Sequence, residues 1–326
     1  MDVQVKEKYI QAVCAAYWMV SYLILPLLSV GLLFYVAFFT AYSHLSFLYM
    51  CWAYFDKETP YKGGRKIPFL RKFLYWKYFN DYFPIQLIKT ADLNGDKNYL
   101  FGYYPHGVLP AGMFGCFGND HSSCKELFPE LNVYCATLDI NFNIPVFREY
   151  CMGIGGISSS KESIKYVLDD KKKGNVAVLA IGGAAESFYA TPGPYRIVLK
   201  NRRGFVKIAL EQGASLVPVF AFGEIDLYKQ YNPPGSKLYK FQNAIKKYIG
   251  FAPLVPVGRG IFINKGLAPF NSPVNVVVGK AIDVPKIPYP TDEEIEKYHT
   301  QFSEELITLF NEHKDKYTEN GELVIQ

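Results

Sequence analysis

The first hydrophobic segment of the chain is unusually long. Residues 9–55 contain no Asp, Glu, Lys or Arg over 47 consecutive positions. One membrane-spanning helix needs about 20 apolar residues, so the segment is long enough for two helices joined by a turn. Pro26, Ser29 and Gly31 lie near its middle, where such a turn would fall. The pattern predicts a transmembrane helical hairpin.

Basic residues lie on both sides of this segment, with Lys6 and Lys8 before it and Arg65 after it. Because basic residues concentrate on the cytosolic side of a membrane, both ends of the hairpin are predicted to face the cytosol. One span plus an interfacial helix is the alternative. We therefore divide the chain into a membrane hairpin over residues 1–60 and a second domain over residues 61–326.

An aromatic and basic segment follows the hairpin. Residues 69–83 combine eight Phe, Tyr or Trp side chains with Arg71, Lys72 and Lys77. Two interpretations stay open. The segment is either an amphipathic helix in the lipid headgroup region or an ordinary amphipathic helix packed on the core.

Beyond about residue 90, short apolar segments alternate with helical ones. Strands are predicted at residues 98–104, 132–138, 175–181, 215–221 and 274–278, and helices at residues 161–170 and 203–212. This alternation is typical of an α/β fold with a central, mostly covered sheet. Thr291 and Glu294 form a capping box. The helix that they begin has one apolar face, predicted to pack on the sheet: Ile295, Tyr298, Phe302, Leu306, Leu309 and Phe310.

Composition and charge restrict the class of partner. The chain is 50% hydrophobic, 17% aromatic and 20% charged, whereas soluble domains carry about 25% charged residues, so contact with a lipid bilayer is favoured. The net charge of +5 and the lack of basic runs interleaved with aromatics argue against nucleic acid. The six cysteines form no CxxC pair, which predicts no metal site and a globular part facing the reducing cytosol.

A histidine lies at a tight turn after the first predicted strand of the α/β region. Residues 103–107 read YYPHG, and Pro105 and Gly107 favour a turn because proline fixes φ and glycine tolerates unusual backbone angles. Ligands of α/β folds bind at such strand ends, and His106 could act there as a general base. The alternative is a turn histidine with an ordinary hydrogen bond.

A loop of small residues follows the buried strand at 175–181. Residues 181–187 read IGGAAES, and Gly182 and Gly183 would let a ligand or another part of the backbone come close. Glu186 could orient an imidazole as the acid of a triad does, or it could lie at a helix N-terminus. Because the loop lacks the G-x-S-x-G pattern of a nucleophilic serine, Ser187 is not predicted to be a nucleophile.

Cationic residues form a third group. Arg148 lies in the segment PVFREY, and Lys200, Arg202, Arg203 and Lys207 lie in or beside the segment RGFVK. CoA carries several phosphate charges, and arginines at a helix start are suited to bind phosphate. The alternative is a solvated, basic helix start.

These motifs, in this order, resemble the type 2 diacylglycerol acyltransferase family, which includes the monoacylglycerol acyltransferases. The resemblance extends from about residue 82 to residue 316. It is carried by the segments FGYYPHG, NFNIPVFREY, IGGAAESF, LKNRRGFVKIAL, LVPVFAFGE, YIGFAP and GRG. The apolar hairpin before them also matches the layout of the family.

The resemblance implies an enzyme that transfers a fatty acyl group from acyl-CoA to diacylglycerol, without a further cofactor, and that makes triacylglycerol. Pro105, His106 and Gly107 would be its catalytic motif, with His106 as the base. The family's other signature positions here are Pro145, Arg148, Gly182, Gly183, Glu186, Arg203, Gly204, Phe205, Pro218, Phe222 and Gly223. The resemblance also implies the endoplasmic reticulum membrane, with the catalytic domain in the cytosol and lipid droplets as a further location. Homo-oligomers are an open possibility.

Two departures from related patterns bear on the base. Many relatives read His-Pro-His-Gly, whereas Tyr104 replaces the first histidine here and leaves His106 as the sole base. Glycerol-phosphate acyltransferases, a distant comparison, carry Asp five positions after the histidine, where this chain has Ala111. The carboxylate partner of His106 must therefore come from elsewhere, and Glu186 is the candidate.

Other functions stay open at this point. The acceptor could be 2-monoacylglycerol or a long-chain alcohol instead of diacylglycerol. The chain could also be a catalytically silent, lipid-binding membrane scaffold, although a scaffold has no use for the motifs around His106, Glu186 and Arg203. A serine hydrolase ranks last.

Overall fold

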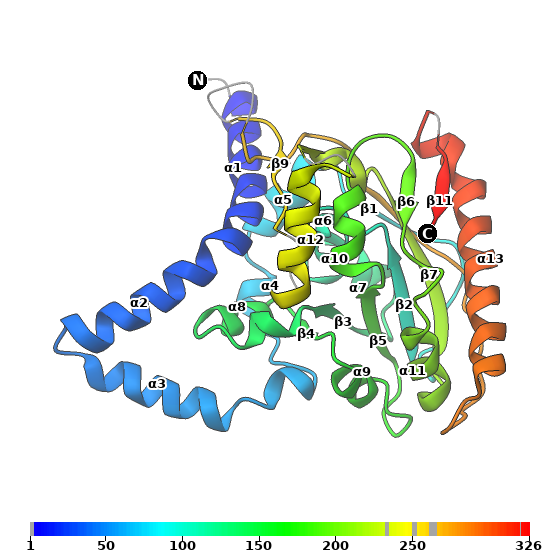
Figure 1. Cartoon of the computed structure of the whole chain (residues 1–326), viewed down its shortest axis with the longest axis horizontal. Coiled ribbons are helices and arrows are strands. Elements are labelled where there is room, and N and C mark those ends of the chain that lie inside the picture. Colours follow the sequence, from blue (N-terminus) through cyan, green and yellow to red (C-terminus); the bar gives the residue numbers. More distant parts are fainter. Residues whose placement is uncertain (1–2, 232–234, 250–252, 261–265, 320) are drawn as a thin grey trace.

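A seven-stranded sheet with helices on both faces forms the centre of the molecule (Figure 1). This computed structural model describes residues 3–231, 235–249, 253–260, 266–319 and 321–326. The strands, in sheet order, are β1 (Gln86–Lys89), β10 (Asn275–Val278), β7 (Ser215–Phe222), β2 (Tyr99–Tyr104), β5 (Asn175–Ala180), β3 (Asn132–Thr137) and β4 (Gly156–Ser158). Neighbours run parallel except for β10 and β7. The predicted α/β fold with a central sheet is confirmed.

Shorter elements complete the described part of the chain. Two small sheets pair β6 (Tyr195–Ile197) with β11 (Leu323–Ile325) and β8 (Lys229–Gln230) with β9 (Pro256–Val257). The helices after β2 are α6 (Ala111–Phe117), α7 (Cys124–Leu127), α8 (Phe147–Gly153), α9 (Lys161–Val167), α10 (Gly183–Glu186), α11 (Gly204–Gln212), α12 (Lys237–Ile249) and α13 (Asp292–Tyr317). Four short 3-10 helices lie at Thr59–Tyr61, Asp139–Phe142, Ser187–Tyr189 (η3) and Glu224–Leu227 (η4).

Strand β2 separates two hydrophobic cores, because successive residues of a strand point to opposite faces. Tyr99, Phe101 and Tyr103 belong to the core shared with the N-terminal helix, α5 and α6. Leu100 and Tyr104 belong to the core shared with α9, α11 and α13. Since both faces are buried, the end of β2 is held from two sides, and the turn that follows it starts from a rigid position.

The periodic segments of the sequence formed the predicted elements. The predicted strands correspond to β2, β3, β5, β7 and β10, and the predicted helices to α9 and α11. The capping box of Thr291 and Glu294 begins α13, which buries its apolar face on the sheet. His299, which had no predicted role, is buried on that face, where its Nε2 lies 3.0 Å from the Leu199 carbonyl oxygen.

The N-terminal segment differs from the predicted hairpin. It forms α1 (Val3–Leu23), α2 (Leu25–Phe39) and α3 (Ser43–Phe55), and the turn lies between α2 and α3. Pro26, Ser29 and Gly31 instead lie inside α2, so the predicted position of the turn is wrong. Pro26 is the second residue of α2, and proline is tolerated in the first turn of a helix, where the backbone N–H groups have no partner in the helix.

The first helix is packed into the core of the α/β region. The ring of Trp18 lies 6.0 Å from that of Trp76, 5.5 Å from Phe79 and 5.2 Å from Phe114, between ring centres. Ala15 and Met19 are buried beside it. Aromatic burial of this kind is a large apolar contribution, and it fixes α1 against α5 and α6.

Helices α2 and α3, which follow α1, extend away from the α/β region (Figure 1). No single helix in the described residues has both the length and the apolar composition of a membrane span, but the pair Gln4–Leu23 and Leu25–Phe39, bent by 60°, meets both criteria together. Helices α2 and α3 lie against each other. Their exposed side chains include Leu27, Phe38, Phe47 and Phe55, each between 67% and 83% exposed.

The aromatic segment at 69–83 forms two short helices instead of one. These are α4 (Pro68–Arg71) and α5 (Tyr75–Tyr82). In α5, Trp76, Phe79 and Tyr82 are buried, which supports the interpretation as a helix packed on the core. Phe69 and Phe73 remain exposed at 71% and 53%.

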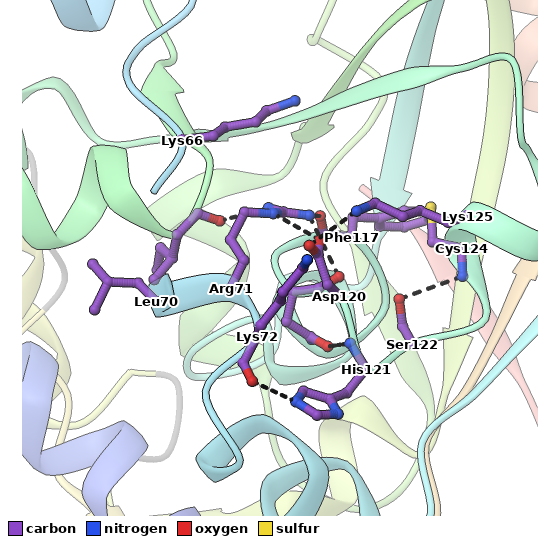
Figure 2. Close-up of polar contacts among 12 residues, drawn as sticks. Lys66, Leu70, Arg71, Lys72, Phe117, Asp120, His121, Ser122, Cys124 and Lys125 are labelled. Atoms are coloured by element: carbon purple, nitrogen blue, oxygen red, sulfur yellow. Dashed lines mark hydrogen bonds and ion pairs between the residues drawn. The ribbon is translucent and has the colours of Figure 1, made fainter. Parts of the chain in front are cut away.

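Arg71 connects this region to two loops (Figure 2). Its guanidinium donates to Asp120 Oδ1 at 3.0 Å, to the Ile154 carbonyl at 3.0 Å, and to the carbonyls of Phe117 and Asn119, both at 3.4 Å. The Arg71 and Asp120 side chains are only 11% and 9% exposed. Because removing one member of a buried ion pair leaves the other charge uncompensated, this contact is important for the stability of the fold.

We expect Arg71→Ala to lower the free energy of unfolding by about 3–5 kcal/mol. Lys125→Ala is the matched control, because Lys125 pairs with the same Asp120 at 2.9 Å but is 69% exposed, and exposed pairs contribute at most about 1 kcal/mol. Thermal unfolding of the detergent-solubilised protein measures both variants. Equal shifts in Tm for the two would contradict the role of Arg71.

Candidate active site

His106 lies just beyond the carboxyl end of β2, the fourth of the seven strands of the sheet. Gly107 has a φ of +65°, a conformation that L side chains rarely adopt, and a Cβ there would lie 2.9 Å from Glu224 Cγ. Glycine is therefore required at this position. The predicted tight turn, here called the histidine turn (residues 105–107), is confirmed, and His106 is partly exposed at its tip.

Two protein oxygens lie next to one nitrogen of the imidazole. Nδ1 is 3.2 Å from the Gly107 carbonyl oxygen and 2.9 Å from Ser187 Oγ. A carbonyl can only accept, so a hydrogen bond to Gly107 assigns the proton to Nδ1, and in this tautomer Nε2 holds the free electron pair. Among the described residues, none bonds to Nε2. The neutral ring can therefore accept a proton at Nε2.

Burial lowers the pKa of His106 below its ordinary value of 6.5, although the hydrogen bonds to backbone groups of His106 and Gly107 oppose this shift. The charged form of an imidazole is disfavoured where water is excluded. His106 is consequently neutral at pH 7, which is the protonation state that a general base requires.

Glu186 contacts the backbone of His106 and not its ring. Its carboxylate accepts hydrogen bonds from the backbone N–H of His106 and, at 2.9 Å, from the backbone N–H of Val198. The predicted contact between this acid and the imidazole is thus corrected. Burial raises the pKa of Glu186 to about 8, opposed by these two N–H groups and by Arg202. The carboxyl group fixes the main chain of the histidine turn.

Ser187 is the side chain that holds the ring, and the sequence analysis missed this role. Ser187 is only 2% exposed, so its side chain is not open to a substrate. In a serine–histidine pair the serine lies on Nε2, with the other nitrogen held by an acid, whereas here it lies on Nδ1. The contact is suited to orient the imidazole and not to activate a nucleophile.

Glu224 is a second buried carboxylate at the histidine turn, and no residue-level prediction named it. It accepts hydrogen bonds from the Tyr103 hydroxyl at 2.7 Å and from the backbone N–H groups of Ala111 and Gly112, both at 2.8 Å. Burial raises its pKa to about 7, opposed by these donors. Glu224 thus joins the end of β2 to the start of α6.

A sequence signal for Glu224 did exist. It comes two residues after β7, and β7 runs parallel to β2 on one side, as β5 does on the other. The carboxyl ends of parallel neighbours lie at the same edge of a sheet. His106, Glu186 and Glu224 therefore meet because they follow three adjacent strands, but the strand order is not readable from the sequence.

The two glycines of the IGGAAES loop allow the backbone conformation of this loop. A Cβ at Gly182 would overlap Glu186 Oε2, so only glycine lets the acid fold back toward His106. Gly183 has a φ of +57° and no atom near the position of a Cβ. Neither glycine is shown to contact a substrate.

Arg148 is not a free cation. Its guanidinium is buried, and it donates to Asp56 Oδ2 at 3.0 Å, to the Asp56 carbonyl at 2.9 Å and to Glu149 Oε1 at 2.9 Å. Asp56 follows the last residue of α3, so Arg148 joins α8 to the end of the N-terminal helices. Arg148 is thus ion-paired with Asp56 and Glu149, and its predicted role in phosphate binding stays a prediction.

The RGFVK segment is also placed differently from the prediction. Phe205 is buried, with its ring centre 4.9 Å from that of Phe302, and Gly204 is the first residue of α11. Arg203 pairs with Glu296 of α13 at 2.6 Å, with both side chains about half exposed. Arg202, in contrast, donates to the Gly182 carbonyl at 3.1 Å and is the cation that reaches the candidate site.

The histidine turn thus combines a neutral, partly exposed imidazole with two buried carboxyl groups. Glu186 binds the backbone of His106, and Glu224 binds Tyr103 before the turn and the start of α6 after it. The described residues contain no group of three or more His, Cys, Asp or Glu able to hold a metal ion. A base placed at the carboxyl edge of a mainly parallel sheet is suited to take a proton from a hydroxyl or a water molecule. The fold and the arrangement of this site are suited to a group-transfer reaction in which the imidazole accepts a proton.

Comparisons with known proteins identify the family. Residues 35–326 match the family model described as diacylglycerol acyltransferase, and the chain belongs to this family. It is 44% identical to 2-acylglycerol O-acyltransferase 1 of Bos taurus, over 97% of this chain and 96% of that protein. It is 42% identical to diacylglycerol O-acyltransferase 2 of Homo sapiens, over 95% of this chain and 81% of that protein. The protein is an acyltransferase, as the resemblance of its motifs predicted.

Among solved structures, a 1-acyl-sn-glycerophosphate acyltransferase of Thermotoga maritima aligns with 92% of this chain and 94% of its own. The TM-score is 0.41 and the identity 11%. At this distance no residue role is transferred from it.

We expect Ser187→Ala to lower kcat only about 2- to 12-fold, because one neutral hydrogen bond contributes about 0.5–1.5 kcal/mol. Loss of a catalytic serine would instead lower kcat by roughly 10⁶-fold. Turnover by the reconstituted protein distinguishes the two, and a fluorophosphonate probe should leave the wild type unlabelled. A labelled Ser187 together with an inactive variant would show that the serine is the nucleophile.

Proposed function

We propose that this acyltransferase moves a fatty acyl group from acyl-CoA to the free hydroxyl of an acylglycerol, with His106 as the general base. The observation that carries the proposal is the state of the imidazole. Nδ1 is held by Gly107 and Ser187, which leaves the Nε2 electron pair for a substrate. Membership of the diacylglycerol acyltransferase family supports the substrate class.

In this mechanism the acceptor hydroxyl gives its proton to Nε2 of His106 while its oxygen attacks the thioester carbonyl carbon. The carbon–sulfur bond of acyl-CoA then breaks, the ester forms, and CoA leaves as a thiolate that takes the proton back from His106. Atoms and charges balance without an acyl-enzyme. No cofactor beyond the co-substrate acyl-CoA takes part.

The two acids contribute by position. The backbone N–H of His106 is already taken by Glu186, so it does not stabilise the developing oxyanion. That task falls to other backbone amides or to water at the strand ends. Glu186 instead holds the backbone of His106, and Glu224 holds the end of β2 and the start of α6 on either side of the turn, so that Nε2 points to the same place in every turnover. Precise placement of a reacting group is worth several orders of magnitude in rate.

Diacylglycerol is the proposed acceptor, and triacylglycerol the product. The relatives carry names for both diacylglycerol and 2-acylglycerol transfer at nearly equal identity, so 2-monoacylglycerol remains the second candidate and a long-chain alcohol the third. The shape of the acceptor pocket decides among them. Family membership argues against the silent scaffold.

We further propose that α2 and α3 enter the endoplasmic reticulum membrane from the cytosolic side. Their exposed surface is rich in aromatic and aliphatic side chains. At about 1.5 Å per residue, the 15 residues of α2 and the 13 of α3 reach only about 20 Å each, less than the roughly 30 Å of the hydrocarbon core. A hairpin dipping into one leaflet fits these lengths better than two full spans, and it would also fit the single monolayer of a lipid droplet.

General-base catalysis contributes about 10²- to 10⁴-fold, so we expect His106→Ala to lower the turnover number by that range while the protein still expresses and folds. Reconstituted protein with radiolabelled acyl-CoA and competing diacylglycerol, 2-monoacylglycerol and a long-chain alcohol measures this loss for each acceptor. Wild type should acylate diacylglycerol fastest.

The control is His313→Ala, because Nδ1 of this helical histidine lies only against the carbonyl of its own helix, at 3.0 Å. Normal turnover by His106→Ala would refute the catalytic role. A loss of folding, read by thermal unfolding, would call for His106→Gln, which keeps the size of the side chain but cannot act as a base.

We expect Phe38→Asp combined with Phe47→Asp to weaken membrane attachment, because a carboxylate inside the bilayer costs about 2.5–3.5 kcal/mol. These rings are 71% and 69% exposed. Alkaline extraction of microsomes should release more of the double variant than of wild type. The matched control is Tyr289→Asp, since Tyr289 is 93% exposed before α13. Equal retention of all three proteins would count against the hairpin.

A further inference from the structure

Positive charge is concentrated in one stretch of the chain. Residues 227–282 contain eight Lys or Arg and not one Asp or Glu, and this excess is larger than the net charge of the whole chain, +5. Within the stretch, α12 carries Lys237, Lys240, Lys246 and Lys247. A helix with several cations and no acid presents a strongly positive surface, and such a surface attracts an anionic partner.

Helix α12 lies over the loop that holds the histidine turn. The ring of Tyr239 is 5.3 Å from that of Phe188, edge to face, and Lys246 Nζ is 5.0 Å from the centre of the same Phe188 ring. Phe188 follows Ser187, whose hydroxyl contacts the imidazole of His106. Figure 1 accordingly draws α12 beside α10. Helix α12 therefore contacts the residue next to Ser187, the side chain that binds the imidazole of His106.

The outer face of α12 is open. Lys237 and Lys240 are exposed, and the neighbouring Phe241 is 63% exposed. The inner face is attached by Tyr239 and by Gln242, which donates to the Pro253 carbonyl at 2.7 Å. Two cations one helical turn apart, with an exposed aromatic ring beside the second, are the groups that bind a phosphorylated nucleotide by charge and by stacking.

A further cation lies on the neighbouring strand. Arg196 of β6 is exposed, and Val198 two residues on donates its backbone N–H to Glu186. Burial and then the Tyr239 hydroxyl raise the pKa of Tyr189, whereas Arg196 lowers it, so Arg196 and Tyr239 both lie next to Tyr189. Helix α12 and β6 thus both bring positive charge near Tyr189, two residues after Ser187.

We propose that this surface, formed by Lys237, Lys240 and Arg196, binds the phosphate groups of CoA and thereby places the thioester at His106. The proposal rests on the proposed function, in which acyl-CoA is the donor. It replaces the predicted phosphate ligands, because Arg148 is buried and paired with Asp56, and Arg203 is paired with Glu296. Lys237 and Lys240 form no ion pair among the described residues, and the helix that carries them contacts Phe188, the residue after Ser187.

The test is the double variant Lys237→Glu with Lys240→Glu, compared with Lys171→Glu with Lys173→Glu as a control of equal charge change. Lys171 and Lys173 are exposed on the turn between α9 and β5. Both variants are reconstituted in phosphatidylcholine vesicles and measured with two donors, acyl-CoA and the matching acyl-pantetheine, which lacks the phosphoadenosine. Reversing two charges should raise KM for acyl-CoA about tenfold or more, leave kcat nearly unchanged, and leave kcat/KM for acyl-pantetheine at the wild-type value.

Four other results have distinct meanings. An unchanged KM for acyl-CoA in the α12 variant overturns the proposal, and so does an equal loss with both donors, which would indicate a structural role of α12. A defect that appears only when phosphatidylserine is added to the vesicles also overturns it, because the surface would then bind the membrane. If wild type transfers no acyl group from acyl-CoA at all, the proposed function itself fails.

Discussion

The hydrogen bond from the backbone N–H of His106 to the buried carboxylate of Glu186 is the constraint on which the site depends. It attaches the turn after β2 to the loop after β5, and Gly182 is needed so that the acid can fold back to make it. Glu224, after β7, binds Tyr103 at the end of β2 and Ala111 at the start of α6, and so holds the residues on both sides of the turn. Both acids are buried, and both have a raised pKa, so the protein keeps them at a cost in desolvation. As a result, the backbone of His106 is held in one position.

In this arrangement the groups that hold His106 contact its backbone and Nδ1, and they leave Nε2 free for the proposed role as a base. Two acids and a serine act on the main chain and on Nδ1, and Nε2 stays open. In a serine–histidine–aspartate triad the acid contacts the ring itself. Here the ring is oriented by neutral groups, so its pKa is not raised by an adjacent carboxylate. A neutral base is suited to a reaction that starts from an uncharged hydroxyl and an uncharged thioester.

Much of the fold was predictable, and so was the tight turn that carries His106. Strands such as β2 and β5 are short apolar runs bounded by turn residues, and α13 has a capping box and one apolar face. The partners of the motif were less predictable. Glu186 was the candidate partner of the His106 imidazole, Ser187 was considered only as a nucleophile, and Glu224 was not singled out. In the sequence, Arg148 and Arg203 resemble phosphate ligands, but in the structure each forms an ion pair with an acidic side chain.

The sequence by itself determined which residues form strands and helices, that the N-terminal segment is long and apolar, and that His106 lies at a turn. These features are local, because they follow from periodicity, from proline and glycine, and from side-chain polarity over a few residues. Only the tertiary structure decided that β7, β2 and β5 are neighbours, that α1 packs into the core, and that α12 covers the loop of Ser187. Contacts between residues far apart in the chain depend on strand order and packing, and neither can be predicted from any single segment of the sequence.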